Sequence, residues 1–354
     1  MRRFIRLLAV LIVMLVAAGV VVIGSFAIMP GHSYNGALPP LTQTEQDSAK
    51  RLQHSVEILA GALGARSLTS APEHLEVAAQ HIESELRQLG YQIETQEYAV
   101  TSPEVKETED LAHQAGDTAV ALMGKKSHNI IATVKGSQHA DEIIVVGAHY
   151  DSVFDCPAAD DNASGVATLL ELARTMAKES PGRTIRFVAF TNEEPPFFRS
   201  PDMGSIHYAD LCAGRKEKIV AMLALETLGY YSDEAGSQKY PGPIGWFYPD
   251  KGNFLAFVGN LNSSTLVHQC VGAFRESTKF PSEGLVAPEL IPGIDFSDQL
   301  GFWQNGYPGV MVTDTAFLRN PFYHTQNDTP DKVDYDKLAR IQSGLLCVVR
   351  KLAQ

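Results

Sequence analysis

The stretch IIVVGAHYDSVFDCPAADDNASG, at residues 143–165, constrains the fold of this chain more than any other part. Its apolar start, residues 143–146, has acidic residues before it and a glycine after it, which predicts a buried strand of a mostly parallel sheet. His149 and Asp151 follow at the carboxyl end of that strand, where ligand sites form in open α/β sheets. A histidine placed there can bind a metal through one ring nitrogen while Asp151 accepts a hydrogen bond from the other.

The acidic second half of this stretch admits two explanations. Asp160, Asp161 and Asn162 stand directly before an apolar pattern with helical spacing at residues 166–176. At a helix start they would satisfy free N–H groups and the helix dipole without any ligand. That explanation does not account for His149, so we favour a ligand site, in which Asp160 is a helix-start or supporting group and not a ligand.

The N-terminus carries an apolar run long enough to cross a membrane. Residues 7–29 are continuously apolar and follow Arg2, Arg3 and Arg6. At about 1.5 Å per residue, a helix of this length spans a hydrocarbon core of roughly 30 Å. The basic flank predicts a cytoplasmic tip at residues 1–6, then a transmembrane anchor, then an extracytoplasmic domain. A cleaved signal segment is the alternative, and it would give a secreted protein.

Composition indicates one large globular domain after this segment. The chain has 354 residues with 45% hydrophobic content, enough for a sizeable core. Residues 30–41 are rich in Gly, Pro, Ser and Asn and predict a tether, which leaves residues 42–354 as the domain. A net charge of −12 argues against nucleic acid as a partner. The 4 cysteines are widely spaced without a CxxC pair, so they are not a zinc site, and no feature indicates an oligomeric state.

Strands and helices alternate through the domain, which predicts an α/β fold with helices on both faces of the sheet. The segment GSQHA between strands at residues 129–134 and 142–146 favours an antiparallel hairpin. Residues 101–127 are polar and poorly patterned, and predict an excursion loop. The other predicted strands lie at residues 91–100, 184–190, 219–225, 253–258 and 308–312, and the helices at 42–64, 72–90, 162–178, 206–212, 265–275 and 335–352.

Side chains that bind metals recur where the predicted strands end. Several carboxylates at one sheet edge repel one another unless cations neutralise them. Two histidines with three carboxylates suit two zinc ions, with one carboxylate bridging the pair and both ions polarising a water and a carbonyl. Glu193 is then free to act as the general base. The candidate ligands are His149, Glu194 and Glu226 at strand ends, Asp161 before a helix, and His324 beyond the last strand.

Five segments, in this order, resemble the co-catalytic di-zinc peptidases: GAHYDS, AADDNASG, TNEE, LETLGYYS and YHTQNDTP. That family includes secreted bacterial leucine aminopeptidases, plasma glutamate carboxypeptidase and glutaminyl cyclase relatives. The resemblance covers about residues 125–350 and implies a mixed, mainly parallel sheet sandwiched by helices. It also implies a role for each site residue: His149, Asp161 and Glu226 bind one zinc, Asp161 bridges to a second zinc held by Glu194 and His324, Glu193 is the general base, and Asp151 orients His149.

Two positions depart from the family pattern. Many members carry Asp where this chain has Glu226, but either residue supplies carboxylate oxygens to a metal. Gln299 stands where a histidine is expected, which bears on the substrate pocket and not on the zinc pair.

These features predict a zinc-dependent exopeptidase with a peptide substrate, and an aminopeptidase is the favoured type. Attack by a metal-bridging hydroxide would release the N-terminal residue, with Glu193 as base. Acids around the site, such as Asp155 and Asp314, suit a cationic α-amine, whereas Arg199 or Arg319 would suit a substrate carboxylate if either pointed into the pocket. One alternative is a glutaminyl-peptide cyclase, which uses a single zinc. Another is a receptor-type ectodomain on the same fold, although a binding module has no need of five ligands and a base.

Overall fold

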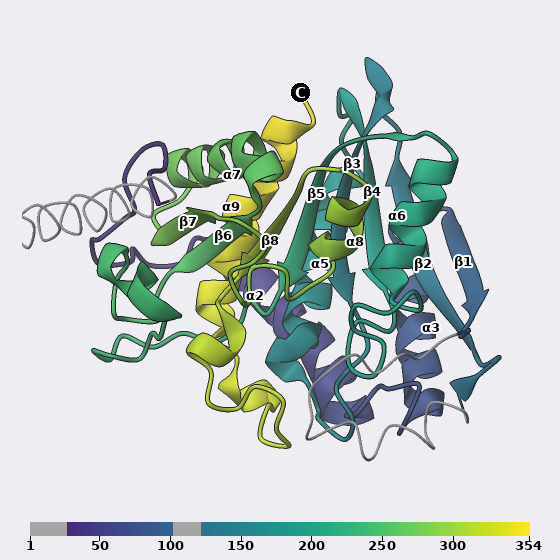
Figure 1. Cartoon of the computed structure of the whole chain (residues 1–354). Coiled ribbons are helices and arrows are strands. Elements are labelled where there is room, and N and C mark those ends of the chain that lie inside the picture. The colour runs from purple at the N-terminus through teal and green to yellow at the C-terminus, as the bar shows by residue number, and fades with distance from the viewer. Residues whose placement is uncertain (1–26, 102–121) are drawn as a thin grey trace, which may run out of the picture.

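Residues 27–101 and 122–354 are described by the computed structural model (Figure 1). One 8-stranded sheet runs through this part of the chain in the order β1-β2-β4-β3-β5-β8-β6-β7. The pairings of β3 with β4 and β5, of β5 with β8, and of β6 with β7 are parallel, and the remaining ones are antiparallel. The strands are β1 (Ile93–Ala99), β2 (Lys126–Val134), β3 (His139–His149), β4 (Arg183–Phe190), β5 (Lys218–Glu226), β6 (Leu255–Gly259), β7 (Ser282–Val286) and β8 (Gly309–Thr313).

Helices cover both faces of the sheet. On one face, residues of α2, α3, α5, α7 and α9 share an apolar cluster with Ile144 and Val146 of β3. The neighbouring Ile143 and Val145 point to the opposite face, where they pack with residues of α6 and α8. The predicted mixed, mainly parallel sheet between helix layers is therefore confirmed. The helices are α2 (Gln43–Val56) with its continuation η1 (Glu57–Leu63), α3 (Pro72–Gln88), α5 (Gly165–Met176), α6 (Gly204–Gly214), α7 (Ser264–Ser277), α8 (Gln299–Gln304) and α9 (Tyr335–Leu352).

Most predicted elements are present near their expected bounds. α2 begins after Thr42, whose hydroxyl accepts the N–H of Glu45 in a capping box. The helix after the acidic cluster begins at Gly165 and not at Asn162, because Asp161 and Asn162 have non-helical backbone angles. β7 and α8 were not predicted: both are short, and the β7 sequence SEGLV mixes in polar residues and a glycine that weaken a strand pattern.

The predicted antiparallel hairpin of β2 and β3 is wrong. Both strands exist, but β4 lies between them, with its Ile185 paired to Val134 of β2 and to Ile144 of β3. The connection from β2 to β3 crosses the start of β4, where the N–H of Ser137 donates to the carbonyl of Pro181. β4 occupies the position between β2 and β3 because its side chains fill the core on both faces of the sheet. The short polar segment between β2 and β3 gives no sign that a third strand lies between them.

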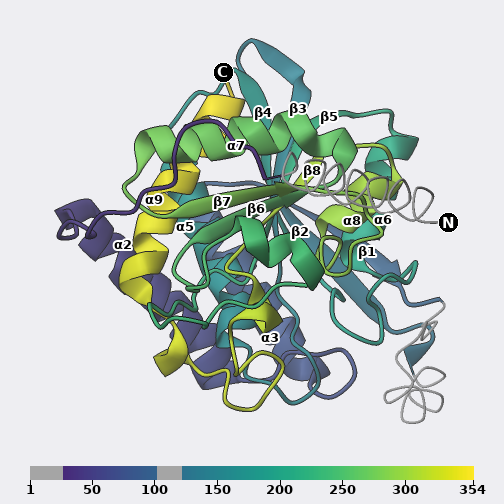
Figure 2. The ribbon, with the colours of Figure 1, turned by 60° about the vertical axis from the view of Figure 1, so that its left-hand side comes forward.

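Part of the predicted N-terminal organisation lies outside the described residues. Residues 1–26 hold most of the predicted anchor, and residues 102–121 hold most of the predicted excursion loop. Among the helices of the described ranges, none is long and apolar enough to cross a membrane. Residues 30–41, the predicted tether, have no helix or strand and are docked on the domain. Residues 28–29, predicted as the end of the anchor, also lie against the domain. Residues 28–33, called the strap from here on, lie against α7 and β7 (Figure 2).

Candidate metal centre

Three neighbouring strands bring candidate ligands to one edge of the sheet. β4, β3 and β5 are parallel neighbours, so their carboxyl ends lie together. His149 is the last residue of β3, Glu226 is the last residue of β5, and Glu194 follows the end of β4. The loop before α5 adds Asp161, and the loop after β8 adds His324.

The predicted ligands form two groups that share Asp161. In the first group, His149 Nε2 lies 3.2 Å from Asp161 Oδ1 and 3.3 Å from Glu226 Oε2. In the second group, His324 Nε2 lies 3.1 Å from Asp161 Oδ2 and 3.3 Å from Glu194 Oε1. Ligand atoms within each group lie within 4.8 Å of one another. The two oxygens of Asp161 thus face different histidines, which is how a carboxylate bridges two ions.

Several of these atoms are buried without a hydrogen bond to any described residue. They are His149 Nε2, both carboxylate oxygens of Asp161, and Glu194 Oε1. Buried polar atoms are normally hydrogen-bonded, and an uncompensated buried charge is costly. Unbonded nitrogen and oxygen atoms that converge in this way fit metal ions, and imidazole with carboxylate is a donor set that zinc takes. The residues present therefore fit two zinc ions.

In the absence of an ion, the charged groups of the site shift one another's pKa. Burial lowers the pKa of His324, but the carboxylates of Glu194 and Asp161 outweigh this effect and raise it to about 11. Burial raises the pKa of Glu194 to about 7, although His324 opposes the shift. For His149, too, the lowering by burial is outweighed, chiefly by Glu226, and its pKa rises well above the usual range. Metal binding would have to displace the protons that these groups hold.

Asp151 does more than orient His149. Its carboxylate Oδ1 lies 3.5 Å from His149 Nδ1, and its own backbone carbonyl lies closer to that nitrogen, at 3.2 Å. The same carboxylate accepts hydrogen bonds from the N–H groups of Glu193 and Glu194, each at 3.1 Å. One side chain therefore links the histidine at the end of β3 to the loop that carries the candidate base.

Glu193 belongs to neither ligand group. It is 6% exposed, and its Oε2 lies 3.9 Å from His149 Nε2. Burial raises the pKa of Glu193 well above its usual range; His149 opposes this shift and Glu226 adds to it. A buried carboxylate beside a ligand set, with a raised pKa, is suited to accept and release a proton.

The loop that carries Asp161 is held by a residue with no role in our sequence-based prediction. Asp328 accepts the N–H groups of Asp160 and Asp161 at 2.9 and 3.1 Å. Asp160 itself is in neither ligand group and accepts the N–H of Gly229 at 2.7 Å, so it is a supporting group. Asp328 lies within the segment YHTQNDTP, but its partners depend on how two distant loops fold, which no local pattern indicates.

Two further supporting residues hold the end of β5. The side chain of Asn162 donates to the carbonyl of Leu225 at 2.7 Å and accepts the N–H of Gly165 at 3.1 Å. The Ser297 hydroxyl donates to Glu226 Oε2 at 2.7 Å. These bonds fix the loop before α5 and the carboxylate of Glu226 in one arrangement.

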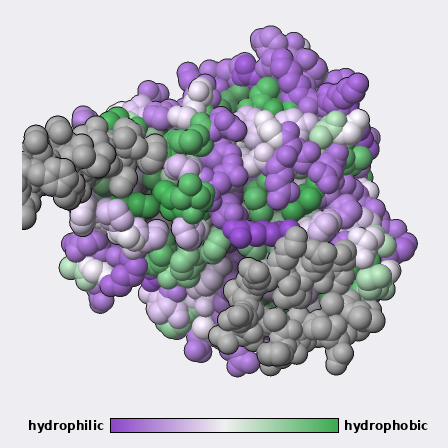
Figure 3. Space-filling view, viewed as in Figure 1, coloured by the Kyte–Doolittle hydropathy of each residue, from purple (hydrophilic) through white to green (hydrophobic). Residues whose placement is uncertain are grey.

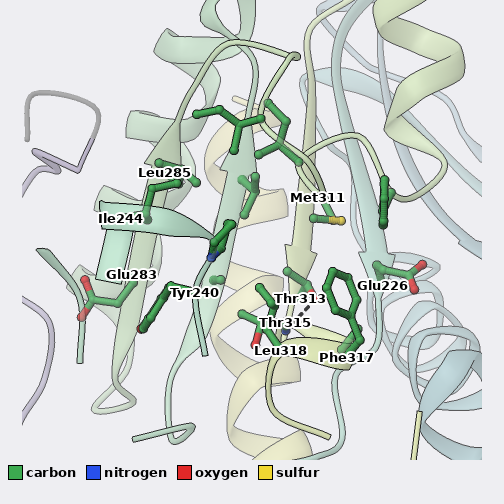
Figure 4. Close-up of a pocket in the computed structure, with 18 of the residues that line it drawn as sticks. Glu226, Tyr240, Ile244, Glu283, Leu285, Met311, Thr313, Thr315, Phe317 and Leu318 are labelled. Atoms are coloured by element: carbon green, nitrogen blue, oxygen red, sulfur yellow. Dashed lines mark hydrogen bonds between the residues drawn. The ribbon is translucent and has the colours of Figure 1, made fainter. Parts of the chain in front are cut away.

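An apolar pocket opens beside the ligand groups (Figure 4). It has a volume of about 810 Å³ with its open mouth included, and Glu226 and Tyr323 line the end nearest the ligands. At the other end lie Glu283 and Leu285 of β7, with Met311 of β8 between (Figure 4). Hydrophobic residues also gather on the surface over β6 and β7 (Figure 3). The pocket therefore runs from the candidate metal centre to the last strand of the sheet.

Gln299, at one of the two departures from the family pattern, is buried at the start of α8. Its side-chain amide donates to the carbonyl of Ile294 at 3.0 Å, and Ile294 lines the pocket. The residue thus supports a wall of the pocket.

Neither arginine considered for a substrate carboxylate is among the described residues that line the pocket. Arg319 is buried, and it donates to the side chain of Gln238 and to the carbonyl of Phe254, each at 2.9 Å. Arg199 forms an ion pair with Asp295 and stacks over the ring of Phe296 at 5.3 Å.

Comparisons with known proteins give the family of this chain. The model of Peptidase family M28 matches residues 129–349. The uncharacterized protein YfbL of Escherichia coli is 42% identical over 240 residues, covering 65% of this chain and 72% of YfbL. A probable leucine aminopeptidase 1 of Trichophyton verrucosum is 30% identical over 250 residues, covering 64% of this chain and 58% of that protein.

Solved structures with different activities share this fold. A zinc aminopeptidase from Bacillus subtilis superposes with a TM-score of 0.65 at 18% identity, covering 86% of this chain and 95% of the other. A glutaminyl cyclase from Bacteroides thetaiotaomicron superposes with a TM-score of 0.61 at 15% identity, covering 89% and 99%. At these identities the likeness concerns the fold alone, and it does not separate the two activities.

The family match, together with two groups of histidine and carboxylate ligands, indicates a zinc-dependent metallopeptidase. Because the family model covers more than half of its length, the chain belongs to peptidase family M28. The chain spans less than two thirds of the length of the fungal aminopeptidase, so the activity of that protein is not transferred to it directly.

Proposed function

We propose that this protein is a di-zinc aminopeptidase. The observation that carries the proposal is the position of Asp161, whose two oxygens face His149 and His324 in two separate groups. In this proposal His149, Asp161 and Glu226 hold one zinc, and Asp161, Glu194 and His324 hold the other. A receptor-type ectodomain has no need of such a set, because binding alone uses neither buried unbonded ligands nor a base.

Glu193 acts as the general base in the proposed reaction. The zinc ions, when bound, supply a polarised water and a polarised scissile carbonyl. Glu193 takes a proton from the water and passes it to the leaving amine, a role open to it because its carboxylate lies beside the ligand groups and belongs to neither. Asp151 positions this base through the N–H of Glu193 and orients His149.

The pocket supports a substrate with an apolar N-terminal side chain. Its walls are mainly aliphatic and aromatic, and its near end lies at Glu226, beside the other candidate ligands. A side chain in the pocket would leave the α-amine among carboxylates, whose field favours a cation. The positions of Arg199 and Arg319, outside the lining residues, agree with an amine and not with a carboxylate.

Substrate polarity can be tested with three matched peptides that begin with Leu. We expect the free peptide and its C-amidated form to be cleaved at similar rates, and the N-acetylated form to resist cleavage, because acetylation removes the cation. Release of Leu is measured by chromatography. As a control, Arg199→Gln should leave this pattern unchanged. Cleavage that tolerates acetylation and is lost on amidation would reverse the assignment to a carboxypeptidase.

A glutaminyl-peptide cyclase is the second candidate, because a cyclase shares the fold almost as closely as the aminopeptidase does. The two candidates differ in the number of metal ions. Metal analysis of the purified chain should find two zinc ions for the hydrolase, and one for the cyclase. Conversion of a Gln-terminated peptide to its cyclic product, without release of the N-terminal residue, would favour the cyclase.

We further propose that residues 7–26 anchor the domain in a membrane, with residues 1–6 in the cytoplasm and the domain outside. This part of the predicted span precedes the strap, and at about 1.5 Å per residue it still reaches roughly 30 Å. The full chain should sediment with membranes and be released by detergent, whereas a variant without residues 1–26 should be soluble. Recovery of the intact chain without detergent contradicts the anchor, and a shortened N-terminus indicates a cleaved signal segment.

A further inference from the structure

The strap and β7 take no part in the chemical step above, yet β7 forms one wall of the pocket and the strap lies behind that wall. β7 is an edge strand of the sheet. Glu283, Gly284 and Leu285 all line the pocket, but a Cβ on Gly284 would point the other way and meet Met29 of the strap and Val271 of α7. An edge strand has backbone groups without a strand partner, so it needs other contacts to hold it.

The strap supplies these contacts from outside. The Ser33 hydroxyl accepts the N–H of Ser282 at 3.0 Å. Met29 packs on Gly284 so closely that a Cβ at Gly284 would lie 2.6 Å from the methionine sulfur. Arg275 of α7 joins the two segments, donating to a strap carbonyl at 3.1 Å and to the carbonyl of Ser282 at 2.6 Å.

The pocket holds the same strand from inside. The Tyr248 hydroxyl donates to the carbonyl of Gly284 at 2.7 Å, and the Tyr248 ring stacks on Tyr240 at 5.7 Å. Both tyrosines line the pocket. β7 is therefore held between the strap on one side and two pocket tyrosines on the other.

We propose that the strap is a specificity element, which braces β7 and so sets the far wall of the substrate pocket. The inference rests on the proposed aminopeptidase function. β7 is three strand positions from β5, about 14 Å at roughly 4.8 Å per strand. In this proposal a side chain as large as Phe extends across the pocket toward that wall, whereas Ala stays near Glu226. Loosening the brace therefore weakens the fit of large side chains and leaves small ones unaffected.

The test compares two double variants of the full chain in detergent. Met29→Ala with Ser33→Ala removes two strap contacts with β7. The control is Leu38→Ala with Thr42→Ala. It also changes two residues of the N-terminal region, but Leu38 packs on the large apolar cluster and Thr42 caps α2. For the strap variant we expect kcat/KM on Phe p-nitroanilide to fall about tenfold, mainly through a higher KM. A small misfit of a side chain in an apolar pocket typically has an effect of about this size. Activity on Ala p-nitroanilide should stay within about twofold, and the control should keep the parental ratio of the two activities.

Hydrogen exchange of residues 282–286 adds a readout that does not depend on catalysis. These amides should exchange faster in the strap variant than in the control or the parent. If exchange is unchanged, the strap does not hold β7 and the proposal is wrong. If exchange is faster but the ratio of kcat/KM on the Phe and Ala substrates is unchanged, the strap has no role in specificity. A parent chain that cleaves neither substrate refutes the proposed function and not the brace. If the double variant does not fold, Ser33→Ala alone should shift both readouts in the same direction by a smaller amount.

Discussion

Glu193→Gln is expected to keep both zinc ions and to lower kcat by about 10²–10⁴, the usual contribution of acid–base catalysis. Glu193 lies outside both ligand groups, so its replacement removes no metal ligand. The hydrogen bond from its backbone N–H to Asp151 is retained, which keeps the loop in place. Turnover on a Leu substrate and zinc content by mass spectrometry are the two measurements.

Glu171→Gln provides the matched control. Glu171 of α5 is also buried, at 6% exposure, but it pairs with Arg51 of α2 and belongs to neither ligand group. This variant should turn over the substrate at close to the parental rate. Parental turnover in Glu193→Gln with its full zinc content would rule out Glu193 as the base.

Removal of metal is expected to abolish activity and to destabilise the domain together. Without metal, buried ligand atoms that have no hydrogen bond, such as both carboxylate oxygens of Asp161 and Oε1 of Glu194, lack the partner that would compensate their burial. Zinc that binds only the folded chain stabilises it by mass action, by about 3–4 kcal/mol at a hundred- to thousandfold excess over Kd. A chelator should therefore lower the melting temperature, and added zinc should restore both stability and activity.

A variant that lacks the shared ligand shows whether the chelator acts through this site. Asp161→Asn keeps the size of the side chain but removes the carboxylate that faces both histidines. Its melting temperature should respond little to chelator or zinc. A parental melting curve that is also unchanged by the chelator would exclude a buried metal centre.

The sequence was sufficient to predict where the candidate ligands gather, because that depends on strand direction and not on strand order. His149 and Glu226 end neighbouring parallel strands, and Glu194 follows a third. The carboxyl ends of parallel strands lie at one edge of the sheet, whatever the order of the strands within it. The wrong hairpin of β2 and β3 therefore left the prediction of the site intact.

The parts that could not be predicted depend on contacts between distant segments. The carboxylate of Asp328 accepts the backbone N–H groups of Asp160 and Asp161. Nothing in the sequence distinguishes Asp328 from an aspartate in any other loop. Residues 30–33 of the strap belong to the predicted tether because their region is rich in Gly and Pro, and residues 28–29 were predicted as the end of the anchor. The docking of the strap arises from partners on α7 and β7, such as Arg275, which lie more than 200 positions away along the chain.

Under the proposed membrane anchor, the docked strap would also limit where the candidate metal centre lies relative to the bilayer. Only residue 27 separates the strap from the proposed membrane span, and one extended residue covers about 3.5 Å. In that proposal the anchored domain would have no flexible linker, and the start of the strap would bring α7 and the edge at β7 toward the bilayer. It would encounter peptides that diffuse within a few nanometres of the membrane, in a fixed orientation, and its natural substrates should be sought among membrane-proximal peptides.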